Sequence, residues 1–140
     1  MTESVVDASA QDQPLRNRWH RVLLVAWLAY WAILTYLLLA PKVPRAPITI
    51  SPKGLVIHCF TFACLAYGRV VVRRAGGGRS TWRWALVWAV VLAAYGGLAE
   101  LIQPLTGRDC DIEDFLADAV GVVVVLLVAT IRDWRRPGAR

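Results

Sequence analysis

The chain has 140 residues, of which 57% are hydrophobic and 19% are charged, and its mean hydropathy is +0.47. This length allows one domain, and the apolar fraction is high for a soluble one. The formal net charge of +6 does not indicate a nucleic-acid-binding protein, because the basic residues gather beside apolar runs.

Four apolar runs each approach the roughly 20 helical residues that cross about 30 Å of hydrocarbon. These runs are Val22–Leu39, Gly54–Val72, Trp84–Ile102 and Phe115–Ile131. The sequence therefore predicts an all-α polytopic membrane protein, a bundle of four transmembrane helices over residues 16–135. The expected helices are about 20–40, 54–73, 82–103 and 112–132. The alternative is a soluble four-helix bundle, but its helices would show polar stripes, which the first and last runs almost lack.

The N-terminal segment, residues 1–15, is polar and without periodicity, so we expect a disordered cytoplasmic tail. The first apolar run also resembles the hydrophobic part of a signal peptide, with Arg16 and Arg21 at its charged start. It is long for such a segment, and a proline stands where cleavage would have to occur. We therefore interpret it as an uncleaved anchor.

The connections between the runs differ in charge. The 40–53 connection holds four prolines and is expected to be an extended outer loop or a re-entrant edge, whereas the glycine-rich 73–83 connection is expected to be a flexible link beside an anionic leaflet. Of the 16 lysines and arginines, 12 lie before the first run, around the 73–83 connection or after the last run. This bias predicts that both termini face the cytoplasm (N-in/C-in) in a bacterial inner membrane.

The stretch 95–121 is unusually acidic for its position between two apolar runs. It holds six of the ten acids of the chain. Glu100 and Gln103 share one helical face with Gly96, and Asp118 shares another with Gly121. Ionisable residues at membrane depth are expensive and tend to be functional, so the sequence predicts a site here.

Topology brings a further set of polar residues to the outer ends of the last three helices. We expect one pocket that opens toward the outer leaflet and is closely packed through the small pairs Ala93/Gly97 and Ala117/Gly121. The catalytic candidates are His58, Glu100 and Asp118. The substrate-binding candidates are Tyr95, Gln103, Arg108, Asp111 and Asp114. His58, Gln103 and Arg108 are the expected partners of the buried acids.

Structural interpretations stay open for some of these residues. His58 is also compatible with a simple interhelical hydrogen bond, Asp111 and Asp114 with capping of the fourth helix, and Arg108 with a surface ion pair to Asp109. We assign no metal site, because zinc sites usually need more than the one suitably placed histidine of this chain. Binding of magnesium or calcium by oxygen ligands stays open. The cofactor is unknown.

Beyond these physical arguments, the pattern resembles a known family. Tyr95-Gly96, Glu100, Gln103 and Arg108 precede a spaced series of acids and a glycine, which are Asp111, Asp114, Asp118 and Gly121. Together with His58-x-x-x-Phe62, this pattern resembles the VanZ-like family of small bacterial membrane proteins. The family usually has asparagine where this chain has Asp118, and an Asp-Lys pair closer to the histidine than Lys53. The resemblance implies a cell-envelope protein, since the founding member is associated with low-level resistance to teicoplanin.

Three functions fit these features. The first is binding or modification of an envelope lipid or lipid-linked precursor, with Glu100 or Asp118 as general base, His58 as acid or base and Arg108 holding a phosphate. The second is a small proton-coupled transporter, since intramembrane acids also serve proton relays. The third is a structural subunit whose polar face binds a membrane-protein partner.

Overall fold

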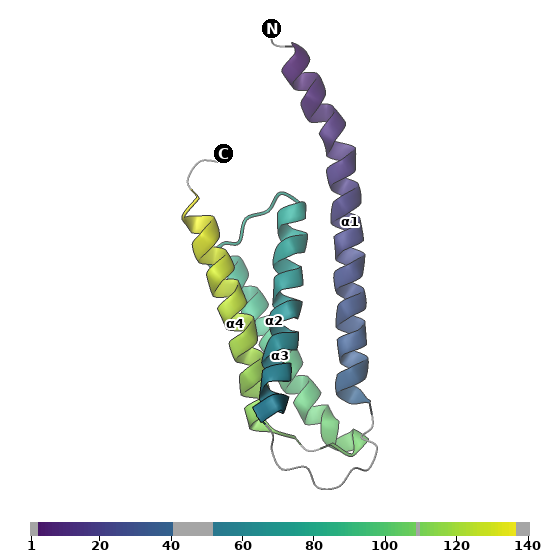
Figure 1. Ribbon diagram of the computed structural model, residues 1–140, viewed down its shortest axis with the longest axis vertical. Coiled ribbons are helices and arrows are strands. Elements are labelled where there is room, and N and C mark those ends of the chain that lie inside the picture. Colours follow the sequence, from purple (N-terminus) through teal and green to yellow (C-terminus); the bar gives the residue numbers. More distant parts are fainter. Residues whose placement is uncertain (1–2, 41–51, 109, 137–140) are drawn as a thin grey trace.

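The computed structural model describes residues 3–40, 52–108 and 110–136, and within these ranges helices are the only regular secondary structure (Figure 1). The helices are α1 (Glu3–Leu39), α2 (Pro52–Ala75), α3 (Trp82–Ile102) and α4 (Ile112–Trp134), with a short 3-10 turn, η1 (Gln103–Thr106). All four α-helices contain a segment long and apolar enough to cross a membrane. The prediction of a four-helix membrane bundle is therefore confirmed, and the chain is a multi-pass membrane protein.

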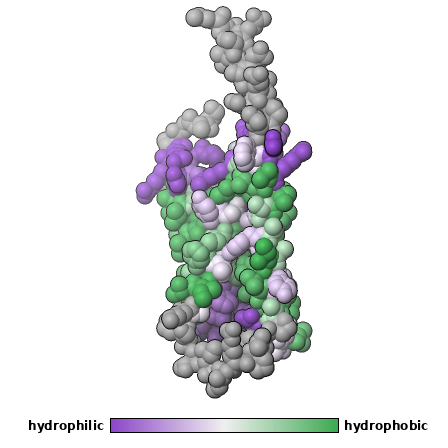
Figure 2. Space-filling view, turned by 45° about the vertical axis from the view of Figure 1, so that its right-hand side comes forward, coloured by the Kyte–Doolittle hydropathy of each residue, from purple (hydrophilic) through white to green (hydrophobic). Residues whose placement is uncertain are grey.

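The helices run alternately up and down, so their ends gather in two places (Figure 1). The arginine-rich end holds the 76–81 connection and the C-terminus of α4. The site end holds the end of α1, the start of α2, η1 and the start of α4. On the face that Figure 2 shows, apolar side chains predominate between the two ends, and hydrophilic side chains gather above and below them.

Helix α1 begins earlier than the sequence predicted. It starts at Glu3, so residues 3–15, expected to be a disordered tail, continue the helix beyond the other three (Figure 1). Nucleation is the unfavourable step of helix formation, whereas each added residue gains a hydrogen bond; a preformed membrane span therefore allows its polar extension to be helical. The expected outer loop over 40–53 falls mostly on residues 41–51, which lie outside the described ranges.

Local sequence explains where the other helices start and stop. The Thr81 hydroxyl accepts a hydrogen bond from the backbone N–H of Trp84 at 3.3 Å and caps α3. Helix α3 ends before Pro104, which cannot donate a backbone hydrogen bond. The chain then turns through Gly107 at φ 75°, a conformation that favours glycine. Asp111 caps α4 by accepting from Glu113 N–H at 2.9 Å, so the predicted start of this helix is confirmed.

Helices α2 and α4 approach each other closely at Gly121. A Cβ atom on Gly121 would overlap the carbonyl oxygen of Cys59 and lie 3.1 Å from the backbone nitrogen of Ala63. Gly97 of α3 is less constrained, because a Cβ there would stand 3.4 Å from the Phe115 ring. The expected close packing through small residues is therefore present, and it is tightest between α2 and α4.

A layer of apolar side chains separates the two ends of the bundle. Its largest members are exposed by 2% or less: Phe62, Leu65, Leu92, Val122 and Leu126. Helix α1 is held against this core by side-chain hydrogen bonds to carbonyls of α2. The Trp27 indole donates to the carbonyl oxygen of Leu65 at 2.9 Å, and the Tyr30 hydroxyl donates to that of Thr61 at 3.0 Å. Large aromatic rings thus supply both apolar contact and a polar link between helices.

The arginine-rich end is organised by Asp133, a residue that no sequence motif singled out. Asp133 is 8% exposed, and its carboxylate accepts hydrogen bonds from Arg74 Nη2 and from the backbone N–H of Ser80, both at 2.8 Å. Arg79 donates to the Asp133 carbonyl oxygen. These contacts fasten the 76–81 connection to α4, so this segment is not the free link that its glycines suggested.

Candidate functional site

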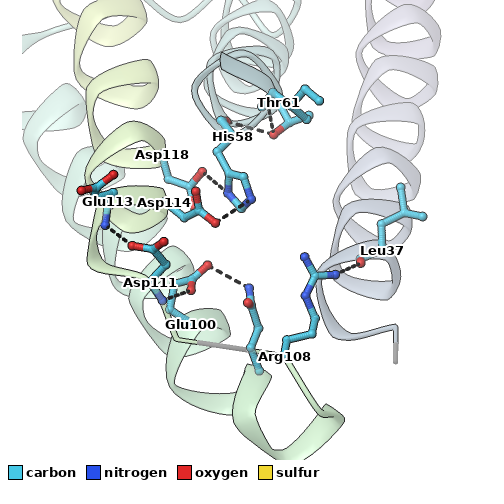
Figure 3. Close-up of polar contacts among 11 residues, drawn as sticks. Leu37, His58, Thr61, Glu100, Arg108, Asp111, Glu113, Asp114 and Asp118 are labelled. Carbon is cyan, nitrogen blue, oxygen red and sulfur yellow. Dashed lines mark hydrogen bonds and ion pairs between the residues drawn. The ribbon is translucent and has the colours of Figure 1, made fainter. Parts of the chain in front are cut away.

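At the site end, a histidine from α2 lies between two aspartates of α4 (Figure 3). His58 Nδ1 lies 3.1 Å from Asp118 Oδ1, and His58 Nε2 lies 3.4 Å from Asp114 Oδ2. The side chains of His58 and Asp118 are 12% and 2% exposed, whereas that of Asp114 is 27% exposed. The two ring nitrogens therefore face different carboxylates, one buried and one closer to the surface.

The third helix adds a buried glutamate to this group. Glu100 is 3% exposed, and its carboxylate accepts a hydrogen bond from Gln103 Nε2 at 2.8 Å. The second Glu100 oxygen accepts from the backbone N–H of Asp111 at 3.2 Å. Gln103 stands one turn after Glu100 and is the first residue of η1, so the end of α3 presents an acid and its donor together.

His58, Glu100 and Asp118 converge, as the sequence predicted. Each offers one ligand atom, and these atoms all lie within 4.8 Å of one another. We call His58, Glu100, Asp114 and Asp118 the acid–histidine cluster. Its members come from α2, α3 and α4, so the cluster depends on the packing of all three helices.

Glycine on α3 leaves room for the cluster. A Cβ atom on Gly96 would stand 3.2 Å from the Phe62 ring and 3.4 Å from Asp118 Oδ2. Phe62 is fully buried and stacks on Tyr95, with ring centroids 5.7 Å apart. Gly96 and Phe62 together therefore close the cluster on the side of the apolar layer.

One oxygen of the cluster has no partner among the described residues. Asp118 Oδ2 is buried and receives no hydrogen bond, although Oδ1 of the same carboxylate faces His58. A buried polar atom without a partner is unfavourable by about 1–3 kcal/mol, and more when it is charged. An atom of this kind in a folded protein calls for an explanation such as a bound ion, water or catalytic role.

Two of the predicted site residues lie away from the carboxylates. The Arg108 guanidinium points toward α1 and donates to the carbonyl oxygen of Leu37 at 3.4 Å (Figure 3). The Tyr95 hydroxyl hydrogen-bonds Thr35 of α1 at 2.8 Å. The expectation that Arg108 pairs with the buried acids is therefore wrong, because the turn after η1 directs its side chain to the end of α1.

The remaining predicted residues have mixed roles. Gln103 is a direct partner of Glu100, as expected. Asp111 uses its side chain as the cap of α4 and contributes its backbone N–H to Glu100, so capping accounts for its carboxylate. Thr35, which binds Tyr95, was not anticipated, since a single threonine in an apolar run carries no spacing signal.

The cluster is also distinct from the surface groove on the outer side of α2 and α4. This open groove of about 650 Å³ is lined by eight apolar residues or cysteine and by Glu113. None of the cluster residues lines it, so the groove is a feature of the apolar surface. Among the described residues, the cluster is the place where buried acids, a histidine and a partnerless oxygen coincide.

Fold and site together define a multi-pass helical membrane protein with a buried acid–histidine cluster near one membrane face. The chain matches no protein-family model, no curated protein and no solved structure. The chemistry of the cluster is therefore the strongest indication of its function.

Proposed function

We propose that this chain is a VanZ-like integral membrane protein of the bacterial cell envelope, which binds or modifies a lipid or lipid-linked cell-wall precursor at the acid–histidine cluster. The observation that carries the proposal is the burial of Glu100 and Asp118 at 3% and 1% exposure beside a single histidine. Such groups are expensive at membrane depth and are commonly kept for function.

The position of the cluster suits a ligand that lies in the membrane. The distribution of arginines favours an orientation with both termini in the cytoplasm of a bacterial inner membrane. In that orientation the site end faces outward, at the depth of lipid headgroups. This setting is also compatible with the association of the VanZ-like family with glycopeptide (teicoplanin) resistance, which concerns precursors outside the membrane.

The pairing of His58 with carboxylates supplies groups for proton transfer. A histidine held by a buried aspartate is a common general acid or base, and Asp118 Oδ1 holds the ring at 3.1 Å. Glu100 is fixed by two donors, so its position is defined before a ligand arrives. Arg108 faces the end of α1 at the same end of the bundle. Among the described residues it has one hydrogen-bond partner, the Leu37 carbonyl oxygen, and its guanidinium suits a phosphate that approaches from the lipid side.

The apolar layer argues against a proton-coupled transporter. Phe62, Leu65 and Leu126 fill the bundle between the cluster and the arginine-rich end, each exposed by 2% or less. A proton path needs polar groups or water along its length, and these three side chains carry neither charge nor hydroxyl. A structural subunit remains the other alternative, in which the polar face binds a membrane-protein partner.

The proposal predicts a change in envelope lipids that depends on Asp118. A strain lacking the protein is complemented with wild type, Glu100→Gln, Asp118→Ala or Glu113→Gln at matched membrane levels, and its lipid-linked intermediates are profiled by mass spectrometry. Alanine replaces Asp118 because asparagine is the usual residue of the VanZ-like family at this position. We expect one species to accumulate at least several-fold in the deletion strain, to be cleared by wild type and to persist with both cluster variants.

Glu113→Gln is the matched control, because it neutralises an exposed acid of α4 outside the cluster. It should restore the profile as wild type does. An identical profile in all five strains would overturn the proposal and favour the structural alternative, which copurification of a stoichiometric partner would then test.

A further inference from the structure

The acid–histidine cluster brings metal-ligand atoms together away from water. We propose that His58, Glu100 and Asp118 bind one hard divalent cation of the Mn²⁺ and Mg²⁺ class. Their ligand atoms lie within 4.8 Å of one another. If the three side chains moved slightly closer together, all three atoms could bind one ion with metal–ligand bonds of about 2.1 Å. The role of the ion rests on the proposed function, whereas the binding of the ion is tested separately.

The partnerless oxygen of Asp118 is the independent observation that points to a ligand. Asp118 is 1% exposed, and its Oδ2 atom has no hydrogen-bond partner within residues 3–40, 52–108 and 110–136. Both Glu100 oxygens accept hydrogen bonds from protein donors, and the other Asp118 oxygen lies 3.1 Å from His58 Nδ1. A cation at the cluster would give this oxygen the positive partner that the protein does not supply.

The charge of the cluster leads to the same conclusion. Glu100, Asp114 and Asp118 contribute three carboxylates, and His58 is the one basic side chain in contact with them among the described residues. Even a protonated histidine leaves an excess of negative charge at membrane depth, which is strongly unfavourable. A divalent cation compensates for this excess without any change in the fold.

The histidine is oriented as metal-binding histidines usually are. In such sites one ring nitrogen binds the ion and the other donates its N–H to a carboxylate or carbonyl. Here Nδ1 lies beside Asp118 at 3.1 Å, and Nε2 faces Asp114 at 3.4 Å. We therefore assign Nδ1 to the ion and Asp114 to the role of orienting the ring.

The donor set favours a hard ion over zinc. One imidazole with two carboxylates is rich in oxygen, and such ligands suit Mn²⁺ and Mg²⁺, whereas zinc favours sites richer in nitrogen and sulfur. A single histidine ligand, which makes zinc unfavourable, is compatible with Mn²⁺ or Mg²⁺. An ion with three protein ligands keeps open positions, and phosphate oxygens are common further ligands of Mg²⁺.

Mn²⁺ binding by the purified chain tests the assignment. The full-length protein in detergent is stripped with a chelator and titrated with Mn²⁺, and free Mn²⁺ is counted by electron paramagnetic resonance. We expect one ion per chain, displaceable by Mg²⁺. Binding should be at least tenfold weaker for Asp118→Asn and for Glu100→Gln, roughly tenfold to a hundredfold weaker for Asp114→Asn, and unchanged for Glu113→Gln.

A spectroscopic readout separates a lost ligand from a lost fold. Pulsed electron paramagnetic resonance of bound Mn²⁺ should show coupling to an imidazole nitrogen, and this coupling should disappear in a His58→Gln variant that still binds Mn²⁺ weakly. No binding by wild type, or equal binding by Asp118→Asn, would overturn the assignment, as would binding of Zn²⁺ without Mn²⁺. An altered lipid profile without Mn²⁺ binding would refute the ion alone, and binding with an unchanged profile would refute the lipid function alone.

Discussion

Gly121→Ala should destabilise the bundle by more than about 3 kcal/mol, because the new methyl group meets backbone rather than side chains. Its Cβ would overlap the Cys59 carbonyl oxygen and stand 3.1 Å from the Ala63 nitrogen. Neither atom can rotate away, so α2 and α4 would have to separate. Ordinarily, replacing glycine by alanine stabilises a helix by about 1 kcal/mol. The expected change in the free energy of unfolding therefore has the opposite sign to the one that helix propensity predicts.

Gly97→Ala is the matched control for this variant. It lies mid-helix on α3, and its Cβ would make an ordinary contact of 3.4 Å with the Phe115 ring. We expect its stability to differ from wild type by about 1 kcal/mol or less. Unfolding of both variants in detergent by a graded denaturant would measure the difference. Equal stability of the two would show that α2 and α4 do not pack as closely as described.

Asp133→Ala should be the second most damaging change, with a loss of about 2–4 kcal/mol. The carboxylate accepts a hydrogen bond from the buried backbone N–H of Ser80 at 2.8 Å, and such a charged bond contributes about 1.5–3 kcal/mol. Its pair with the partly exposed Arg74 adds about 0.2–1 kcal/mol. Without the carboxylate, the 76–81 connection loses its attachment to α4.

Limited proteolysis gives this prediction a second readout. Trypsin should cleave the connection after Arg79 faster in Asp133→Ala than in wild type, because release of the loop exposes the bond. Asp133→Asn keeps one acceptor for Ser80 and should give an intermediate rate. Glu113→Ala, which removes an exposed acid from the same helix, should leave the rate unchanged. Equal cleavage of all four proteins would contradict the role given to Asp133.

Much of this architecture was predictable from sequence because membrane helices carry a strong signal. Apolar length fixed the four spans, and Pro104 and Asp111 marked the end of α3 and the start of α4. The start of α1 was not predictable in this way, because polar residues that extend a formed helix carry no apolar periodicity. Asp133 was overlooked for a similar reason: one acid among arginines resembles a solvated helix end.

The site was predictable where helical spacing determines the direction in which a side chain points. Glu100 and Gln103 lie one turn apart on α3. His58 and Asp118 occupy the same depth because consecutive helices run in opposite directions, so that α2 and α4 both start at the site end. Arg108 was misplaced because it follows η1, and the direction of a side chain in a turn is not set by helical periodicity. The partnerless Asp118 oxygen was beyond prediction, since it depends on packing around Gly96 and Phe62.

The central claim is that the acid–histidine cluster is kept for function at some expense of stability. Asp118→Asn tests it most directly, because asparagine keeps the oxygen that faces His58 and places an uncharged amide at the partnerless position. In chelator-treated detergent solution we expect a midpoint of thermal unfolding equal to or above that of wild type, since the variant removes uncompensated buried charge. A midpoint lowered by an amount that corresponds to about 3–5 kcal/mol would show that Asp118 and His58 form a structural ion pair, and would contradict the claim.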